Sequence, residues 1–160
     1  MNDAPATFEL IADTSGPPTS PLVVSVPHAG TRVPDGDRPL LALEGPALLR
    51  DADLFVDRLY AQVPGRGIAT LRALVSRYVL DVNRAPDDVD REVCPGIESN
   101  RAARTSARGL VWRVTTDGAP VLSRPLTKAE LDSRIARIHT PYHDALARLL
   151  EERRAHFGYA

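Results

Sequence analysis

Apolar residues in the first half of the chain follow patterns that are typical of strands and loops. Residues 22–26, LVVSV, are apolar except for Ser25, as in a strand covered on both faces of a sheet. Two further apolar runs, GIATLRALV (67–75) and RYVLDV (77–82), predict two more strands, and FELIA (8–12) predicts a short edge strand. Eight of the 14 prolines lie in the first 46 residues, which disfavours helices in that region.

Helical periodicity appears in two segments. In residues 47–63 apolar side chains recur at steps of three and four, so this segment predicts a helix that ends at the sequence PGRG. A longer helix is predicted from Thr127, the N-cap of a capping box with Glu130, to Gly158, a natural C-cap. Pro141 lies in the middle of this helix and is expected to kink it.

A hairpin and several loops complete the pattern. LVWRVTTDGAPVL (110–122) predicts a hairpin with Asp117 and Gly118 at its turn. Residues 97–109 are small, polar and rich in arginine, and predict a surface loop. Strand character resumes in the last two residues of the chain. Strands that alternate with helices, together with one hairpin, indicate an α/β sheet with helices on its faces.

Length and composition narrow the class of protein. The 160 residues suffice for one domain, and 43% hydrophobic with 26% charged residues is typical of a globular chain. With 20 basic and 21 acidic residues, the net charge of −1 predicts neither nucleic acid nor a membrane as a partner. No apolar stretch is long enough to span a bilayer and no signal peptide is evident, so a cytoplasmic location is expected. Cys94 is the only cysteine, which excludes an intrachain disulfide and a thiolate zinc site.

His28 lies in a turn, PHAG, directly after the predicted strand 22–26. In open α/β sheets, polar residues just beyond the carboxyl end of a strand line the binding crevice. A neutral imidazole is a common metal ligand and a common general base. A single histidine in this position is more often a hydrogen-bonded structural residue, so a functional role for His28 requires acidic partners and a coherent substrate site nearby.

An acidic cluster in RDADLFVDRLY supplies such partners. It contains Asp51, Asp53 and Asp57. On the predicted helix, Asp53 and Asp57 are four residues apart and share a face. The functional interpretation makes Asp53 a metal-binding carboxylate that reaches toward His28. The structural alternative pairs Asp57 with Arg50 or Arg58 at the surface.

The segment SRYVLDVNRAPDD concentrates polar residues on a strand-like run. With a period of two, Arg77, Val79, Asp81 and Asn83 would face one way. Burying three polar groups on one face is costly unless they bond to each other or to a ligand. An Asn83–Arg84 pair at the strand end suits a carboxylate, since guanidinium binds it as a fork and the amide donates a further bond. The alternative is an internal Arg77–Asp81 salt bridge without a ligand.

Other candidate residues carry weaker signals. His139 and His143 are four apart, the spacing of a helical two-histidine metal site, but no Glu follows His139 as the metalloprotease motif requires. Capping and orienting roles for Tyr142 and His143 are therefore favoured over ligation. Trp112 is expected to pack in the core or the hairpin. No phosphate loop, dinucleotide fingerprint or nucleophile elbow is present.

Four motifs in order, SVPHAGTRVP, DLFVDRLY, SRYVLDVNRAPDD and TPYHDAL, resemble the N-formylglutamate amidohydrolase family from about Pro21 to Ala160. The resemblance implies hydrolysis of N-formyl-L-glutamate to formate and L-glutamate, the final step of one histidine-degradation route. It also implies a three-layer α/β/α fold with a mixed sheet, a phosphorylase/hydrolase-like fold similar to that of the zinc carboxypeptidases.

The resemblance also implies a zinc site. His28 matches the family's histidine in its PH-[small]-G motif, a zinc ligand. Asp53 matches the acidic position before VD-x-L and is implied as the second ligand, with Asp57 in support. Zn²⁺, or another divalent metal, would polarise the formyl carbonyl and lower the pKa of a water molecule to make the nucleophile.

Substrate-binding roles follow from the same resemblance. Asn83 and Arg84 match an N-R step that resembles the pair with which zinc carboxypeptidases hold a substrate carboxylate. Arg77 is assigned to the same substrate site, where Arg77 and Asp81 would buttress the pair. The implied partner is a small molecule with carboxylates, and Tyr142 and His143 would support the site.

Members of the family are longer and continue past FGYA into a strand ending in an Asp-x-His-Ser pattern. That segment is expected to bring a further histidine ligand, and later residues the catalytic carboxylate, so the catalytic residues are expected beyond Ala160. Residues 1–160 are thus interpreted as the N-terminal portion of one α/β hydrolase domain, whose unpaired sheet edge could support self-association.

Two other functions compete with this interpretation. The first is a truncated, non-catalytic homologue that binds an acidic small molecule or a partner chain. The second is a carboxypeptidase-like peptidase, against which counts the lack of a His-x-x-Glu motif at His28.

Overall fold

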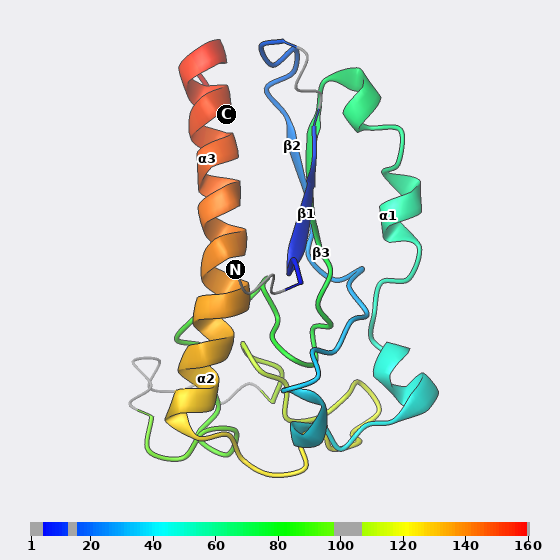
Figure 1. Ribbon diagram of the computed structural model, residues 1–160, viewed down its shortest axis with the longest axis vertical. Helices are drawn as coiled ribbons and strands as arrows, with labels where there is room; N and C mark the ends of the chain where they lie inside the picture. Colours follow the sequence, from blue (N-terminus) through cyan, green and yellow to red (C-terminus); the bar gives the residue numbers. More distant parts are fainter. Residues whose placement is uncertain (1–4, 13–15, 98–106, 160) are drawn as a thin grey trace.

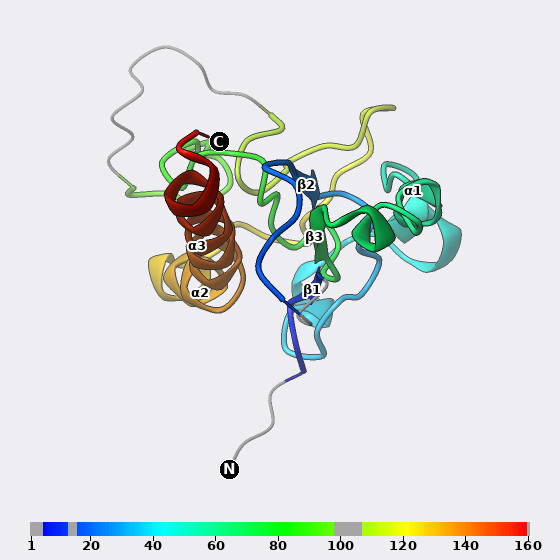
Figure 2. The ribbon, with the colours of Figure 1, turned by 90° about the horizontal axis from the view of Figure 1, so that it is seen from above.

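The protein has a mixed α/β fold, seen in a computed structural model that describes residues 5–12, 16–97 and 107–159. A small sheet lies between one long helical segment and, on its other side, a set of short helical turns (Figures 1 and 2). The α/β class predicted from the sequence is therefore confirmed.

The sheet has three strands: β1 (Phe8–Ile11), β2 (Val23–Val26) and β3 (Ala69–Ala73). Their order is β1-β3-β2, with β3 antiparallel to β1 and parallel to β2. All three strands occupy positions where the sequence predicts strands. The prediction that 22–26 is covered on both faces holds only in part, because Val26 is buried but Leu22 and Ser25 are exposed. β2 is also an edge strand of this sheet.

The prediction of a strand at residues 77–82 is wrong, because the structure has no strand there. After an isolated bridge at Val75 the chain turns, with the amides of Val79 and Leu80 directed at the carbonyl of Ser76. The side chains of Val79 and Leu80 are nevertheless buried. A buried turn and a buried strand give the same apolar run in a sequence, so periodicity alone could not separate them.

The single helix predicted at residues 47–63 is also wrong. This segment contains a 3-10 turn (Gly45–Leu49), the short helix α1 (Val56–Leu59) and a second 3-10 turn (Pro64–Arg66). Asp53 donates its amide to the carbonyl of His28 at 3.0 Å, and Phe55 adopts a left-handed φ of 68°. A continuous α-helix tolerates neither feature, so contact with the His28 loop takes precedence over helical periodicity.

The C-terminal helical segment comprises α2 (Lys128–Arg134), a π-helical turn (Ile135–His139) and α3 (Thr140–Phe157). The predicted capping box between Thr127 and Glu130 is present, and the predicted C-cap, Gly158, has a φ of 80°. The π turn lies just before Pro141, where the sequence predicts a kink. Proline has no N–H to donate, and a widened turn accommodates its ring.

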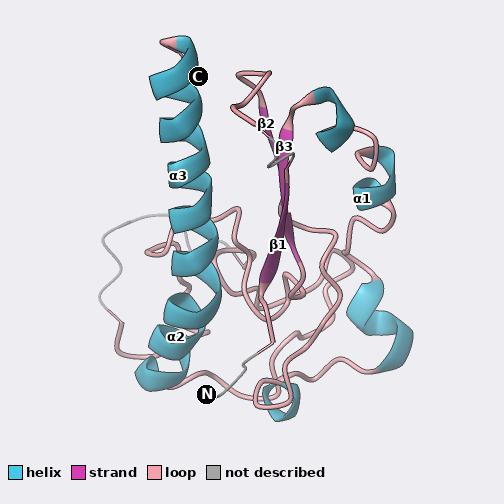
Figure 3. Ribbon diagram, turned by 45° about the horizontal axis from the view of Figure 1, so that its top comes forward, coloured by secondary structure: helices cyan, strands magenta, loops and turns pink. Residues whose placement is uncertain are grey.

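Between β3 and α2 the described residues contain bridges and turns but no named helix or strand, as Figure 3 shows. The predicted hairpin turn is present, since Thr115 N–H donates to the carbonyl of Ala119 at 2.9 Å. Its arms form an isolated bridge between Val114 and Pro120 rather than strands. Most of the predicted loop 97–109 lies outside the described residues.

One buried ion pair, which the sequence analysis missed, connects the C-terminal helical segment to the rest. Arg134 is fully buried and donates to Asp37 Oδ1 and to the carbonyl of Val79 at 2.8 and 2.9 Å.

Among the described residues, no helix has the length and apolarity needed to cross a bilayer.

Candidate active site

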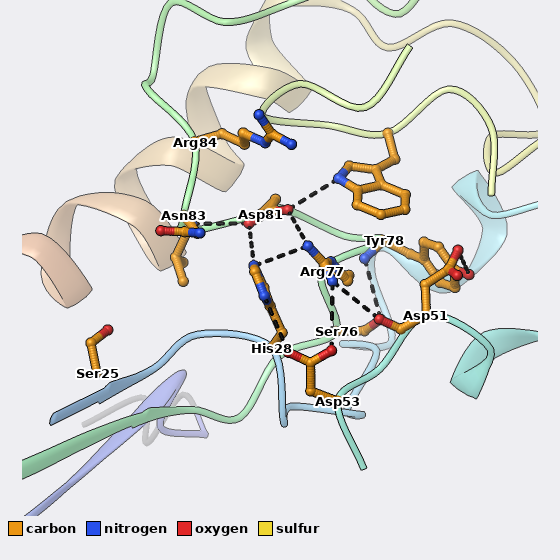
Figure 4. A network of polar contacts seen from close by, with 12 residues as sticks. Ser25, His28, Asp51, Asp53, Ser76, Arg77, Tyr78, Asp81, Asn83 and Arg84 are labelled. Atoms are coloured by element: carbon orange, nitrogen blue, oxygen red, sulfur yellow. Dashed lines mark hydrogen bonds and ion pairs between the residues drawn. The ribbon is translucent and has the colours of Figure 1, made fainter. Parts of the chain in front are cut away.

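His28 is placed by a tight loop that follows β2. The loop passes so close to the segment after β3 that a Cβ on Gly30 would lie 2.4 Å from the carbonyl oxygen of Val75. Only glycine fits such an approach without a shift of the backbone. His28 is 9% exposed, and its ring lies at the end of the sheet where the parallel strands β2 and β3 have their carboxyl ends (Figure 4).

The two ring nitrogens of His28 face two carboxylates. Nε2 lies 2.8 Å from Asp81 Oδ1, and Nδ1 lies 3.5 Å from Asp53 Oδ2 (Figure 4). Asp81 is fully buried, whereas the side chain of Asp53 is half exposed. The sequence prediction that Asp53 reaches toward His28 therefore agrees with the geometry.

Asp81 is the hub of the site. Its oxygens accept hydrogen bonds from Arg77 at 3.0 Å, from the Trp112 indole at 3.1 Å and from the amide of Asn83 at 2.9 Å, in addition to His28. Burial acts to raise the pKa of Asp81, but the hydrogen bond from His28 and the electrostatic interactions with His28 and Arg77 lower it to about 2. Asp81 is therefore ionised at neutral pH and acts only as an acceptor.

The ionised state of Asp81 fixes the tautomer of His28. A carboxylate has no proton to give, so the 2.8 Å bond to Asp81 requires the proton on His28 Nε2. The guanidinium nitrogen of Arg77 that lies 3.1 Å from the same Nε2 is then a close contact between two donors, and both of them are directed at Asp81. In the neutral ring, Nδ1 then presents its lone pair toward Asp53. A lone pair and a carboxylate in such proximity repel each other unless a proton or a cation lies between them.

Arg77 is committed to this network. Its guanidinium lies 4.4 Å from the centroid of the Trp112 ring and donates to Asp81 and to the backbone carbonyl of Asp51. It also lies 3.9 Å from Asp53 Oδ1. The internal Arg77–Asp81 pair that the sequence left as an alternative is present, formed across a turn rather than along a strand.

The other two carboxylates of the acidic cluster point elsewhere. Asp51 accepts hydrogen bonds from the hydroxyl of Tyr78 and from Thr116 at the hairpin; burial acts to raise its pKa, but these bonds lower it. Asp57 pairs with Arg72 on β3, not with Arg50 or Arg58 as the structural alternative proposed. Asp53 is therefore the carboxylate of the three that lies beside His28.

Asn83 and Arg84 follow Asp81 on an exposed turn. Both side chains are exposed, and neither makes a hydrogen bond or an ion pair with another described residue. The backbone at the same positions is held firmly, since Asn83 N–H donates to Asp81 Oδ1 and Arg84 N–H to the Asp81 carbonyl at 3.1 Å. Figure 4 shows Asn83 beside Asp81, with Arg84 further from His28.

Tyr142 and His143 bind the protein backbone and the sheet rather than the His28–Asp53 pair. The Tyr142 hydroxyl lies 2.7 Å from Ser25 Oγ and 3.3 Å from the carbonyl of Leu71. His143 Nε2 lies 2.8 Å from the carbonyl of Val82. These contacts show what each side chain binds, and the predicted support of the site by Tyr142 and His143 stays a prediction.

The geometry of His28 and Asp53 agrees with that of two protein ligands of a tetrahedral zinc site. Two such ligand atoms, each about 2.1 Å from the metal, lie about 3.4 Å apart, and His28 Nδ1 and Asp53 Oδ2 are 3.5 Å apart. A metal-ligating histidine also donates its other N–H to a carboxylate, as His28 does to Asp81. Among the described residues, no group of three or more His, Cys, Asp or Glu side chains is arranged to hold a metal.

Sequence reasoning missed the hairpin's part in the site. Trp112, expected only to pack, donates to Asp81, and Thr116 near the hairpin turn binds Asp51 across 65 residues of sequence. An indole in an apolar run has the same pattern whether it packs or donates. The signal that could have pointed to Trp112 is its N–H, which needs an acceptor when it is buried.

Comparison with known proteins identifies the family. A family model described as N-formylglutamate amidohydrolase matches residues 20–160, a range that includes His28, the acidic cluster and the turn of Asn83 and Arg84. The chain belongs to the N-formylglutamate amidohydrolase family. The resemblance noted in the sequence is thereby confirmed.

Individual members of the family agree with this result. The chain is 36% identical over 143 residues to the N-formylglutamate deformylase of Pseudomonas aeruginosa and 34% identical over 142 residues to that of Pseudomonas putida. Each match covers 88% of this chain and 49% of the relative, so the chain spans about half the length of these relatives.

A crystal structure from the same family has a similar fold. The N-formylglutamate amidohydrolase from Ralstonia eutropha JMP134 superposes with a TM-score of 0.82 at 35% sequence identity. The superposition covers 96% of this chain and 54% of the solved one. The small mixed sheet and its flanking helices thus match an amidohydrolase fold.

Proposed function

We propose that this chain carries the His28 half of a metal-dependent amidohydrolase site that cleaves N-formyl-L-glutamate to formate and L-glutamate. The substrate class comes from the names of the relatives, N-formylglutamate deformylase. The observation that carries the metal assignment is the His28 Nδ1–Asp53 Oδ2 separation of 3.5 Å, with the other ring nitrogen bonded to Asp81.

In this proposal, His28 and Asp53 hold the metal, and Asp81 keeps the histidine ready to bind it. The ionised Asp81 accepts a hydrogen bond from the Nε2–H of His28, so the lone pair of Nδ1 remains available on the side of Asp53. Zinc in such a site supplies Lewis acidity toward a carbonyl oxygen. Arg77 keeps Asp81 and Asp53 in place without entering the chemistry, since both of its terminal nitrogens are already bonded.

Asn83 and Arg84 are proposed to bind a substrate carboxylate. Arg84 presents a guanidinium that no described residue pairs with, and the neighbouring amide of Asn83 adds a donor. A guanidinium fork binds a carboxylate through two parallel bonds, which fixes orientation as well as charge. Glutamate derivatives carry two carboxylates, so a site of this kind suits them.

Two protein ligands are fewer than the three that catalytic zinc sites use. The proposal therefore assigns the third ligand and the general base to polypeptide outside the described residues, within a fold similar to that of the zinc carboxypeptidases. The share of each relative that the match covers, 49%, supports this view.

A second function has one observation in its favour. The guanidinium of Arg84 has no partner among the described residues, and these residues hold only two of the ligands that a catalytic zinc site needs. Arg84 could therefore bind a carboxylate of an acidic small molecule or a partner chain without catalysis. The two functions differ in zinc binding and in the release of formate.

The test combines zinc affinity with a formate-release assay. We expect His28→Gln and Asp53→Asn each to weaken zinc binding at least about tenfold, measured by competition with a chromophoric chelator. Asp57→Asn is the matched control, because Asp57 pairs with Arg72 away from His28. Zinc affinity that is equal in all four proteins would reject the metal site.

Formate release is measured with N-formyl-L-glutamate, and N-formyl-L-leucine serves as the control substrate. Release from the first alone, dependent on zinc, supports the amidohydrolase. Binding of N-formyl-L-glutamate without release of formate, by protein that also contains the polypeptide to which the third ligand and the base are assigned, favours the non-catalytic function.

A further inference from the structure

Two histidines of the C-terminal helical segment hold the turn that carries Asn83 and Arg84. His143 Nε2 lies 2.8 Å from the carbonyl oxygen of Val82, and His139 Nε2 lies 3.0 Å from that of Arg84. The carbonyls on both sides of Asn83 are therefore bound by side chains that lie more than 50 residues away in sequence. A carbonyl is only an acceptor, so each Nε2 carries the proton of its bond.

The two imidazoles form a single stacked unit. Their ring centroids lie 4.1 Å apart with an interplanar angle of 29°. His139 is the last residue of the π-helical turn and His143 lies in the first turn of α3, four residues later, so the two rings lie on the same face of the helix. Burial lowers the pKa of His139, which favours the neutral form that donates to Arg84.

The same helical turn also binds the sheet. Tyr142 lies between the two histidines in sequence, and its hydroxyl contacts Ser25 on β2 and the carbonyl of Leu71 on β3. β2 leads directly into the His28 loop. One turn of helix therefore fixes the sheet that positions His28 and the turn that presents Asn83, and it sets the distance between them.

We propose that His139 and His143 are positioning residues that preorganise Asn83 and Arg84 for a carboxylate. The inference rests on the proposed function, in which that pair binds a substrate carboxylate. The exposed side chains lack protein partners among the described residues, while their backbone is bound on both sides. A turn held this way loses little conformational entropy when it binds a ligand, which strengthens binding.

The test compares two nearly identical replacements of one histidine. His143→Gln places an amide donor close to the position of Nε2, whereas His143→Asn is one methylene shorter and cannot reach the Val82 carbonyl. His156→Asn is the control, because His156 lies on the same helix and contacts Phe157 rather than the turn. All variants are small polar changes on a long helix, and their thermal denaturation is recorded first.

Two readouts are taken on the 160-residue chain. The first is the backbone order of residues 82–85 by NMR relaxation, which needs no ligand. The second is the dissociation constant for N-formyl-L-glutamate by calorimetry. We expect His143→Asn to lower the order of the turn and to weaken binding about tenfold. His143→Gln and His156→Asn should stay within about twofold of the wild type.

The outcomes separate this inference from the proposed function. Unchanged order of the turn and unchanged affinity in His143→Asn would overturn the positioning role, as would equal losses in the Asn and Gln variants. Wild-type protein that does not bind N-formyl-L-glutamate would count against the proposed function alone. In that case the order of the turn in the two variants still decides the positioning role.

Discussion

Asp81 offers the most direct test of the network around His28. It is fully buried and accepts hydrogen bonds from His28, Arg77, Trp112 and the amide of Asn83. Replacing Asp81 by Asn preserves the shape of the side chain but removes the charge, and it directs an amide N–H at groups that are themselves donors. We expect Asp81→Asn to destabilise the metal-free protein.

The magnitude follows from the pKa. Interaction with its donors lowers the pKa of Asp81 from the ordinary 3.8 to about 2, and each pH unit corresponds to about 1.4 kcal/mol. Ionised Asp81 therefore contributes about 2 kcal/mol to the free energy of unfolding at neutral pH. Because the folded-state pKa is the lower one, this contribution is complete above about pH 5 and is lost as the pH falls toward 2, with about 1 kcal/mol gone at pH 3.

Urea unfolding in the presence of a chelator, at pH 7 and at pH 3, measures both effects. Asp81→Asn should lose at least about 2 kcal/mol at pH 7 and should be less sensitive to acid than the wild type by about 1 kcal/mol. Asp132→Asn is the control, since its exposed pair with Lys128 should change stability by less than about 0.5 kcal/mol. Equal losses between pH 7 and pH 3 in the wild type and in Asp81→Asn would refute the reasoning.

Three further variants test other parts of the fold by urea or thermal denaturation. Asp37→Asn should cost about 3 kcal/mol, because it leaves the buried charge of Arg134 without its partner; a loss below about 1 kcal/mol would contradict this. Gly30→Ala should lower the free energy of unfolding by about 2 kcal/mol, since its Cβ would lie 2.4 Å from the Val75 oxygen. An unchanged urea midpoint would show that the loop shifts to accept the methyl group without loss of stability. Phe55→Asn should gain about 1 kcal/mol, because asparagine tolerates the left-handed φ of 68° better; a lower Tm would argue against strain at this residue.

The sequence predicted which side chains lie close together better than it predicted the backbone that carries them. His28 and Asp53 were paired on the strength of motifs, and they lie in contact. The helix expected around Asp53 and the strand expected around Asp81 are both absent, because each segment is held by long-range contacts. Local periodicity contains no information about an amide that bonds to His28 or a turn that closes on Leu110.

The capping residues of the C-terminal helical segment, in contrast, could be predicted from the sequence alone. Thr127 and Glu130 form the box that their spacing predicts, and Gly158 ends α3 in the left-handed conformation. These features depend on residues close in sequence, so the sequence specifies them without the tertiary fold. The contacts of Trp112 with Asp81 and of His139 with Arg84 join residues that are 31 and 55 positions apart. No local sequence pattern predicts contacts of this kind.

The central place of β3 governs the order in which the chain can fold during synthesis. β1 and β2 leave the ribosome first but do not pair with each other, so no sheet exists until β3 has emerged. The face of the sheet that α3 covers stays exposed for longer, because the hydrogen bond between Ser25 and Tyr142 joins residues that are 117 positions apart in the sequence. At a translation rate of roughly 5–20 residues per second, the synthesis of these 117 residues takes about 6 to 23 seconds. The interval between the synthesis of β3 and that of α3 is therefore the stage at which the nascent chain most needs protection from aggregation.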